Sequence, residues 1–240
     1  MVPVVESTNN TRSVATPQPK PLIKLNLGCG TNKLPGWENH DADVDITKPL
    51  PWPDAVISHI LIEHCVEHVG YHQAIAFFKE AWRVLSLGGI LRVAVPSLEM
   101  IRKCDDGDYH KFTTKWQRIG PTKRGALHAI IYAHGHQMIW SASLLEAVLY
   151  FCGFDQIEQC EPGSSRHEVL RGVEGHGKVI SDRFNKIESC VFEATKQGTL
   201  PVSFDHRVAV VVGGSVRVDQ DIEAVECMGS PSIEGTRNQN

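Results

Sequence analysis

The feature that most constrains this chain is the string LNLGCG at residues 25–30, a short apolar run that ends in a glycine turn. Glycine adopts positive φ and lets a ligand approach the backbone closely, so the string predicts a strand that delivers a turn to a sheet edge. A tight turn without a ligand is the simpler alternative. A dinucleotide fingerprint is excluded because Lys33 occupies its third glycine position. The turn therefore favours a ligand without a pyrophosphate.

Beyond the turn, strand patterns and helix patterns alternate. Residues 55–62 form a buried-strand type of run, residues 71–85 place apolar side chains on one helical face, and residues 90–95 form another strand. This order predicts an α/β fold with a parallel sheet and crossover helices. Weaker patterns predict short strands at 38–40 and 42–46, a serine-capped helix at 141–152, and late strands at 154–160 and 187–194.

Composition changes divide the chain into four parts. Residues 1–21 are rich in Thr, Asn, Ser and Pro and predict a disordered leader, whereas residues 22–197 carry the folded domain. Residues 198–218 predict a short β extension, two strands joined by Gly213-Gly214. Residues 219–240 hold five acidic side chains and one arginine, so this tail accounts for the whole net charge of −4 and predicts disorder.

The composition of residues 1–218, the part before the acidic tail, excludes several classes of protein. Its basic and acidic side chains balance, so a nucleic-acid partner is not expected, and no apolar run is long enough for a membrane span. The seven cysteines are scattered without a CxxC pair, which predicts free thiols and a cytoplasmic location. One basic stretch at 109–124 is either a patch for an anionic substrate or a solvated helix face.

Two aspartates follow the glycine turn. A carboxylate at the tip of the second strand, Asp41, could accept two hydrogen bonds from adjacent ribose hydroxyls. Asp45 with Ile46 could offer an acceptor and an apolar face to an adenine ring. Each aspartate taken alone is more often a turn residue, but their order after LNLGCG favours a nucleoside ligand.

These residues carry a family resemblance. The strings LNLGCGTNKLPGWENHDADVDITKPLPWPD, ILIEHCVEHV and FFKEAWRVLSLGGILRVAVPSL resemble class I S-adenosylmethionine-dependent methyltransferases, most of all an uncharacterised branch of the small-molecule or glycan type. The resemblance is strong over residues 22–100 and weaker to about residue 197. It implies a Rossmann-like methyltransferase fold: a doubly wound, mostly parallel seven-stranded sheet with an antiparallel last strand.

The resemblance also implies how S-adenosyl-L-methionine would bind. The turn Gly28-Cys29-Gly30 would cradle its methionine part, Asp41 would bind the ribose, and Asp45 with Ile46 would border the adenine. Asn26 stands where the family usually has an acidic residue, so its contact with the cofactor's amino group would be neutral. Two further residues, Glu63 and His64, would lie at the end of the fourth strand beside the sulfonium.

The histidines allow more than one interpretation. His64, His68 and His72 recur every four residues, and imidazoles on one helical face can share a zinc ion. Gly70 interrupts any such helix, and no matching Cys or acidic cluster is evident elsewhere, so we expect no metal and an active-site rim of ordinary imidazoles. His136 matches an isolated histidine of the family by position. The Gly- and His-rich stretch 162–183 could cover the site.

The predicted activity is methyl transfer to a small-molecule or glycan acceptor at a hydroxyl, for which a neutral imidazole could serve as base. His68 is the first candidate base, His64 more plausibly lines the cofactor, and His136 is the outside candidate. The alternative is a regulatory or interaction protein that binds the cofactor without acceptor chemistry. A nucleic-acid methyltransferase is disfavoured because residues 62–65, Ile-Glu-His-Cys, lack the Pro-Pro-aromatic string.

Overall fold

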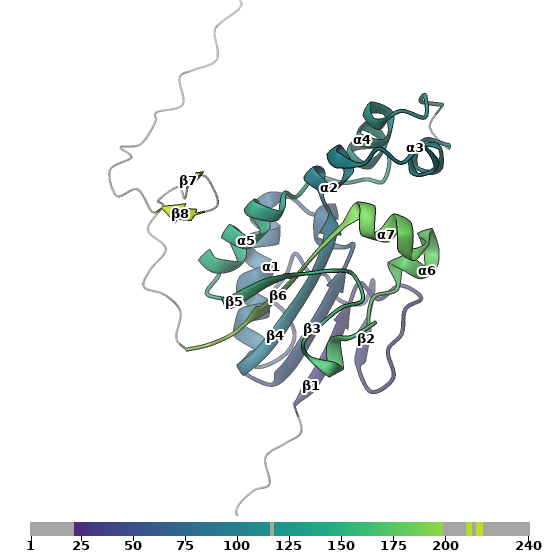
Figure 1. Cartoon of the computed structure of the whole chain (residues 1–240). Coiled ribbons are helices and arrows are strands. Elements are labelled where there is room, and N and C mark those ends of the chain that lie inside the picture. Colours follow the sequence, from purple (N-terminus) through teal and green to yellow (C-terminus); the bar gives the residue numbers. More distant parts are fainter. Residues whose placement is uncertain (1–21, 116–117, 199–209, 213–214, 218–240) are drawn as a thin grey trace, which may run out of the picture.

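Four parallel strands form the centre of the computed structural model, which describes residues 22–115, 118–198, 210–212 and 215–217 (Figure 1). With β6 and β5 they make one sheet in the order β2-β1-β3-β4-β6-β5, in which β6 runs in the opposite direction to the other five strands. The strands are β1 (Ile23–Leu27), β2 (Glu38–His40), β3 (Ile57–Glu63), β4 (Leu85–Pro96), β5 (Asp155–Cys160) and β6 (Ser189–Thr195). The predicted α/β fold with an antiparallel last strand is confirmed.

The helices lie between these strands. The α-helices are α1 (Tyr71–Val84), α2 (Leu98–Lys103), α3 (Gly107–Thr114), α4 (Lys123–Tyr132), α5 (Ala142–Phe151), α6 (His176–Ile180) and α7 (Asp182–Glu188). Two 3-10 turns, η1 (Val66–His68) and η2 (Glu168–Leu170), occur in the connections. Among the helices that the structure describes, none combines the length and apolar character that crossing a membrane requires.

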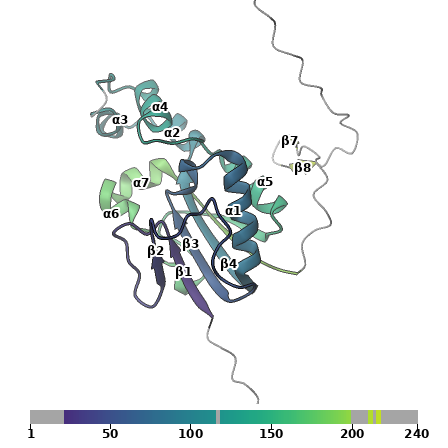
Figure 2. The ribbon, with the colours of Figure 1, turned by 180° about the vertical axis from the view of Figure 1, so that it is seen from behind.

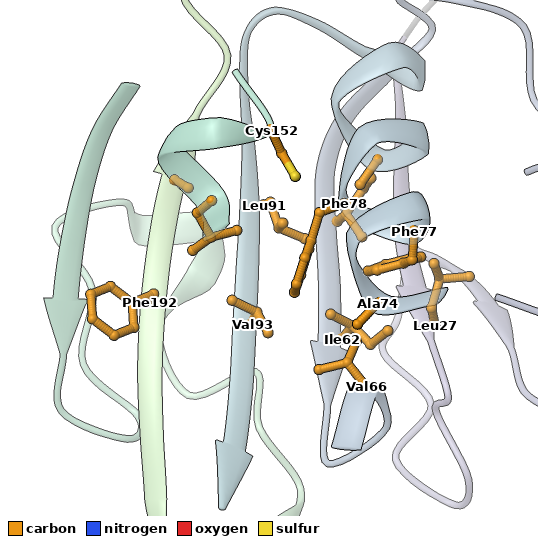
Figure 3. Close-up of a cluster of buried hydrophobic side chains, with 14 of the residues drawn as sticks. Leu27, Ile62, Val66, Ala74, Phe77, Phe78, Leu91, Val93, Cys152 and Phe192 are labelled. Carbon is orange, nitrogen blue, oxygen red and sulfur yellow. The ribbon is translucent and has the colours of Figure 1, made fainter. Parts of the chain in front are cut away.

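One face of the sheet is covered by α1 and α5. Helix α1 lies across this face in Figure 2, and its side chains at helical spacing pack on strand residues such as Ile62 and Val93 (Figure 3). Helix α5 begins where Ser141 Oγ accepts the Leu144 N–H at 3.1 Å, so the predicted serine cap is confirmed. The result is one continuous apolar core between the helices and the sheet.

The opposite face is covered differently. The segment 161–175, which includes η2, follows β5 and passes in front of the sheet (Figure 1). It places Glu174 beside two neighbouring residues of the sheet, Arg92 on β4 and Glu193 on β6, and all three side chains are buried. A charged cluster therefore stands where a second layer of helices would supply apolar side chains.

The carboxyl ends of the parallel strands carry two long connections. Residues 97–141, with α2, α3 and α4, follow β4, and residues 161–188, with η2, α6 and α7, join β5 to β6. Figure 1 shows α2, α3 and α4 extending beyond the sheet edge at which α7 also lies. Helices α2–α4 have a small apolar cluster of their own around Tyr109 and Ile130. Both connections therefore enclose the edge at which ligands bind in open α/β sheets.

Two predicted strands differ from the structure. The sheet has six strands among the described residues, whereas the resemblance implies seven. Residues 42–46 form turns instead of a strand, because aspartate oxygens bond to nearby backbone N–H groups: Asp43 accepts from Asp41 at 2.8 Å and Asp45 from Thr47 at 2.8 Å. Prolines in the remainder of the connection to β3 cannot donate ladder hydrogen bonds.

The predicted hairpin beyond the domain is present. Strands β7 (Val210–Val212) and β8 (Ser215–Arg217) pair antiparallel. The predicted leader at 1–21 and the acidic tail at 219–240 lie outside the described residues.

Candidate active site

The glycine turn leaves the carboxyl end of β1 between two neighbouring strands. Gly28 and Gly30 have φ of +63° and +48°, the left-handed region that glycine adopts without strain. A Cβ on Gly28 would lie 2.9 Å from Cys65 Sγ, whereas a Cβ on Gly30 would meet nothing within 4 Å. Cys29 is buried and donates its N–H to the His40 carbonyl at 3.0 Å. The turn is therefore closed beneath Gly28 and open at Gly30.

Asn26 supports the loop that follows the turn. Its side chain is buried, and its Nδ2 donates to the Asn32 carbonyl at 2.8 Å and to Asn39 Oδ1 at 2.9 Å. Asn39 in turn donates to the carbonyls of Leu34 and Trp37. Both amide hydrogens of Asn26 are thus used inside the loop, which leaves only its Oδ1 for the expected contact with a cofactor.

The two predicted nucleoside-binding aspartates lie in different surroundings. Asp41 follows β2 directly, its side chain is exposed, and no group of the described residues hydrogen-bonds to its carboxylate. Asp45 Oδ1 accepts from both the N–H and the hydroxyl of Thr47, which lowers the pKa of Asp45. Ile46 is only 8% exposed and packs in the main core. Of the three, Asp41 is the one free to bind a ligand.

These observations fit S-adenosylmethionine. Open space at Gly30 would admit a ligand against the backbone, and an unbonded carboxylate on the neighbouring strand suits the two ribose hydroxyls. Asp41 also lies close enough to Cys29 for its charge, after burial, to raise the pKa of that thiol. The turn and Asp41 thus lie close enough together at the sheet edge to contact one ligand.

Glu63, at the end of β3, holds the segment that covers this edge. Its two carboxylate oxygens accept the backbone N–H groups of Gly175 at 2.7 Å and His176 at 2.9 Å. Asn32 Nδ2 fixes the same segment through the Val173 carbonyl at 2.8 Å. The carboxylate predicted to lie beside the sulfonium therefore anchors residues 173–176 over the sheet edge.

His64 follows Glu63 in a left-handed conformation with φ of +47°, a strain that non-glycine residues keep mainly at functional sites. Its Nε2 lies 2.7 Å from Ser189 Oγ, and that hydroxyl donates to Asn185 Oδ1 at 2.6 Å, so Nε2 is the donor. Its Nδ1 lies 3.4 Å from Glu67 Oε1. Burial opposes protonation, but Glu67 outweighs it and raises the pKa of His64.

A cavity of about 340 Å³ opens beside His64. It lies between the loop after β3, helices α3 and α4 with the loop after α4, and the segment with α6 and α7. Its volume is in the range of small-ligand sites. The rings of His64 and His176 stack with centroids 3.7 Å apart, and those of His68 and His136 meet edge to face at 4.9 Å. The cavity is lined by His64, Glu67, His68, Phe112, Thr113, Ile130, His134, His136, His176, Ile180 and Glu188.

The predicted interruption at Gly70 separates the histidines that recur every four residues. His68 ends η1, whereas His72 lies in α1, which begins after Gly70, so the two do not share one helix. His136 approaches His68 instead, because the N–H groups of Gln137 and Met138 bond to the Glu67 carbonyl at 2.9 Å and 3.2 Å. All three candidate bases, His64, His68 and His136, border the same cavity.

Sequence analysis missed the acidic residue at the back of this cavity. Glu188 is buried, accepts from Tyr109 Oη at 2.9 Å and lies 3.2 Å from His176 Nε2. Burial alone would raise its pKa, but His176 and His64 lower the pKa of Glu188. From the Gly- and His-rich stretch 162–183, His176 and Ile180 line this cavity. Glu188 had no signal, since it lies within a helix that precedes a late strand.

The basic stretch is a solvated surface over much of its length. Lys111 on α3 lies 3.8 Å from Asp108, and Lys123 on α4 pairs with Asp105. These partners neutralise two of its five cations. The solvated helix face is therefore favoured over a patch for an anionic substrate.

No protein-family model matches this chain, and no curated protein is detectably similar in sequence. Solved structures are similar at low identity. A SAM-dependent methyltransferase from Archaeoglobus fulgidus is 15% identical, with 73% of this chain and 86% of that chain covered and a TM-score of 0.45. An S-adenosylmethionine-dependent methyltransferase from Mesorhizobium loti is 14% identical, with 73% and 91% covered and a TM-score of 0.42.

The similar structures also include the [4+2]-cyclase SpnF, 16% identical with a TM-score of 0.41, for which 73% of this chain and 74% of that chain are covered. One fold can serve several reactions. The function has to be argued from the residues of this chain.

Proposed function

We propose that this chain transfers a methyl group from S-adenosylmethionine to a hydroxyl of a small-molecule or glycan acceptor, as a cytoplasmic enzyme. The observation that carries the proposal is the open glycine turn beside the unbonded Asp41, next to a cavity rich in histidine. The sequence resemblance to class I methyltransferases supports the same conclusion. When bound, the cofactor supplies a sulfonium-activated methyl group.

The protein would act mainly by positioning. The turn and the cavity are neighbours, because Gly28 lies against Cys65, and His64 and Glu67 on either side of Cys65 line the cavity. An acceptor in the cavity would therefore lie beside a cofactor on the turn, and holding both reactants together supplies much of the rate acceleration. The connections over the sheet edge would limit the entry of water.

A hydroxyl acceptor has to lose its proton. His64 is a poor base, because Nε2 is a donor to Ser189 and Nδ1 faces Glu67. His136 Nδ1 lies 2.6 Å from the Ile130 carbonyl and therefore carries its proton there, which leaves Nε2 bare. His68 is exposed at the rim of the cavity. His68 and His136 are thus the groups that could receive the acceptor's proton.

Cofactor binding is tested by calorimetric titration with S-adenosylhomocysteine, the demethylated product. We expect micromolar affinity, about 8 kcal/mol. Asp41→Ala should weaken binding more than the matched variant Asp45→Ala, by about 1.5–3 kcal/mol for each charged hydrogen bond lost, because the Asp45 carboxylate is occupied by Thr47. Equal losses, or no heat from the wild type, would contradict the assignment.

Turnover is tested by incubating the chain with methyl-labelled cofactor and fractionated small-molecule and glycan extracts. Label transferred to a hydroxyl compound supports the proposal, and His68→Ala should then lower turnover by about 10²–10⁴ with cofactor affinity unchanged. Cofactor binding without any labelled product would instead identify a protein that binds the cofactor for regulation.

A further inference from the structure

We propose that Glu67, His68 and His136 form a binding site for a divalent transition-metal ion at the mouth of the histidine cavity. One ligand atom from each of the three side chains lies within 4.8 Å of the others. Two imidazoles and one carboxylate, with a position left for water or substrate, are the ligand set of many catalytic zinc sites. The inference rests on the proposed function only for its role in the reaction, not for the binding of the ion.

Glu67 supplies the independent observation that points to an ion. Its side chain is 0% exposed, and neither carboxylate oxygen has a hydrogen-bond partner among the described residues. His64 Nδ1 lies 3.4 Å from Oε1, and Oε2 has no hydrogen-bond partner among the described residues. An ionised carboxylate out of water is costly unless it is paired or coordinates a metal. A dication between Glu67 and the two imidazoles would supply that missing partner.

The tautomer of His136 suits it to coordinate a metal ion. Its Nδ1 hydrogen-bonds to the Ile130 carbonyl at 2.6 Å, which fixes the tautomer and leaves the Nε2 lone pair available. A second-shell carbonyl of this kind commonly orients metal-binding histidines. His68 is exposed, so few neighbours restrict the orientation of its ring.

A second group of possible ligands lies nearby, but its polar atoms already have partners. His64 Nε2 is bonded to Ser189. Glu188 lies against both His176 and Tyr109, at 3.2 Å and 2.9 Å. Because these side chains satisfy one another, they need no ion. They therefore serve as the control for the proposed site.

A bound divalent ion lowers the pKa of a coordinated oxygen, which is the assistance that a hydroxyl acceptor needs. In that case His68 and His136 would hold the ion rather than receive the proton. A measurement of metal binding in the absence of any acceptor distinguishes the role of metal ligand from the role of base.

The experiment titrates Zn²⁺ into the full chain, free of affinity tag and stripped with chelator, by calorimetry. We expect one equivalent to bind, and Glu67→Gln, His68→Ala and His136→Ala each to weaken binding by more than about 100-fold. His72→Ala, on the exposed surface of α1, and His176→Ala, in the second group, should bind as the wild type does. Substitution with Co²⁺ should give visible absorption bands that the first three variants lose.

Two results would overturn the proposal: Zn²⁺ binding that is unchanged in Glu67→Gln and His136→Ala, or binding that is lost in His176→Ala but kept in His136→Ala. Circular dichroism verifies that each variant is folded, and the exposed His68 gives a variant that does not disturb the core. Titration of the wild type with S-adenosylhomocysteine, without metal, tests the proposed function separately. Failure there with Zn²⁺ still bound would leave the metal site standing.

Discussion

The two faces of the sheet are stabilised in different ways. On the face beneath α1 and α5, apolar side chains from neighbouring strands and helices form one continuous core. On the opposite face, Arg92 is held between Glu174 and Glu193, and one oxygen of each carboxylate has no hydrogen-bond partner within the described residues. The first face tolerates small changes of volume, whereas the second depends on a balance of buried charges.

The largest expected effect comes from Arg92→Met. Removing the guanidinium would leave two buried carboxylates without a cation, and breaking a buried ion pair in this way costs about 3–5 kcal/mol. The free energy of unfolding by chemical denaturation measures the loss. The control is Arg183→Met, an arginine 59% exposed that also faces two carboxylates, Asp106 and Asp108. Its loss should be about 0–1 kcal/mol; similar losses in both variants would show that burial is not the cause.

Replacing the whole cluster should reverse the effect. In Arg92→Met combined with Glu174→Met and Glu193→Leu, no charge remains to be desolvated. Well-packed apolar replacements of buried ion pairs are often neutral or more stable by about 1–4 kcal/mol. The free energy of unfolding of the triple variant, measured by chemical denaturation, should therefore be at least that of the wild type. A triple variant as unstable as Arg92→Met would mean that the cluster does more than balance charge.

The smallest expected effect is on the apolar face. Ile62→Val deletes one methylene from the core beside Val93 and should cost about 0.5–1.5 kcal/mol. The same denaturation measurement applies, and the slope against denaturant should not change because the fold is retained. A loss as large as that of Arg92→Met would remove the difference between the two faces.

The same difference decides how much of the fold is visible in the sequence. The apolar face follows from local patterns: helical spacing predicts α1, an apolar run predicts β3, and Ser141 marks the start of α5. The charged face joins β4, the segment after β5, and β6, which are far apart in the chain. Neither the partners of Arg92 nor the segment that covers them follows from a local pattern.

The candidate site likewise has one part that local sequence patterns predict and one part that they do not. The glycine turn and Asp41 were predictable because each lies directly after a strand, and parallel strands end at a common edge. The cavity was only partly predictable. Its histidines were suspected one group at a time, but only the fold brings His136 to His68 and buries Glu67 between them. Spacing alone would group His68 with His72, but Gly70 precedes the first residue of α1 and separates the two, as the sequence predicts.

The contact between Gly175 and Asn32 has a consequence for how this protein can diverge. A Cβ on Gly175 would lie 2.6 Å from Asn32 Cβ, although the backbone at Gly175, with φ of −107°, would accept any side chain. The steric limit therefore comes from the partner and not from the backbone. Positions 32 and 175 should covary in related sequences, so that a side chain at 175 occurs only with glycine at 32.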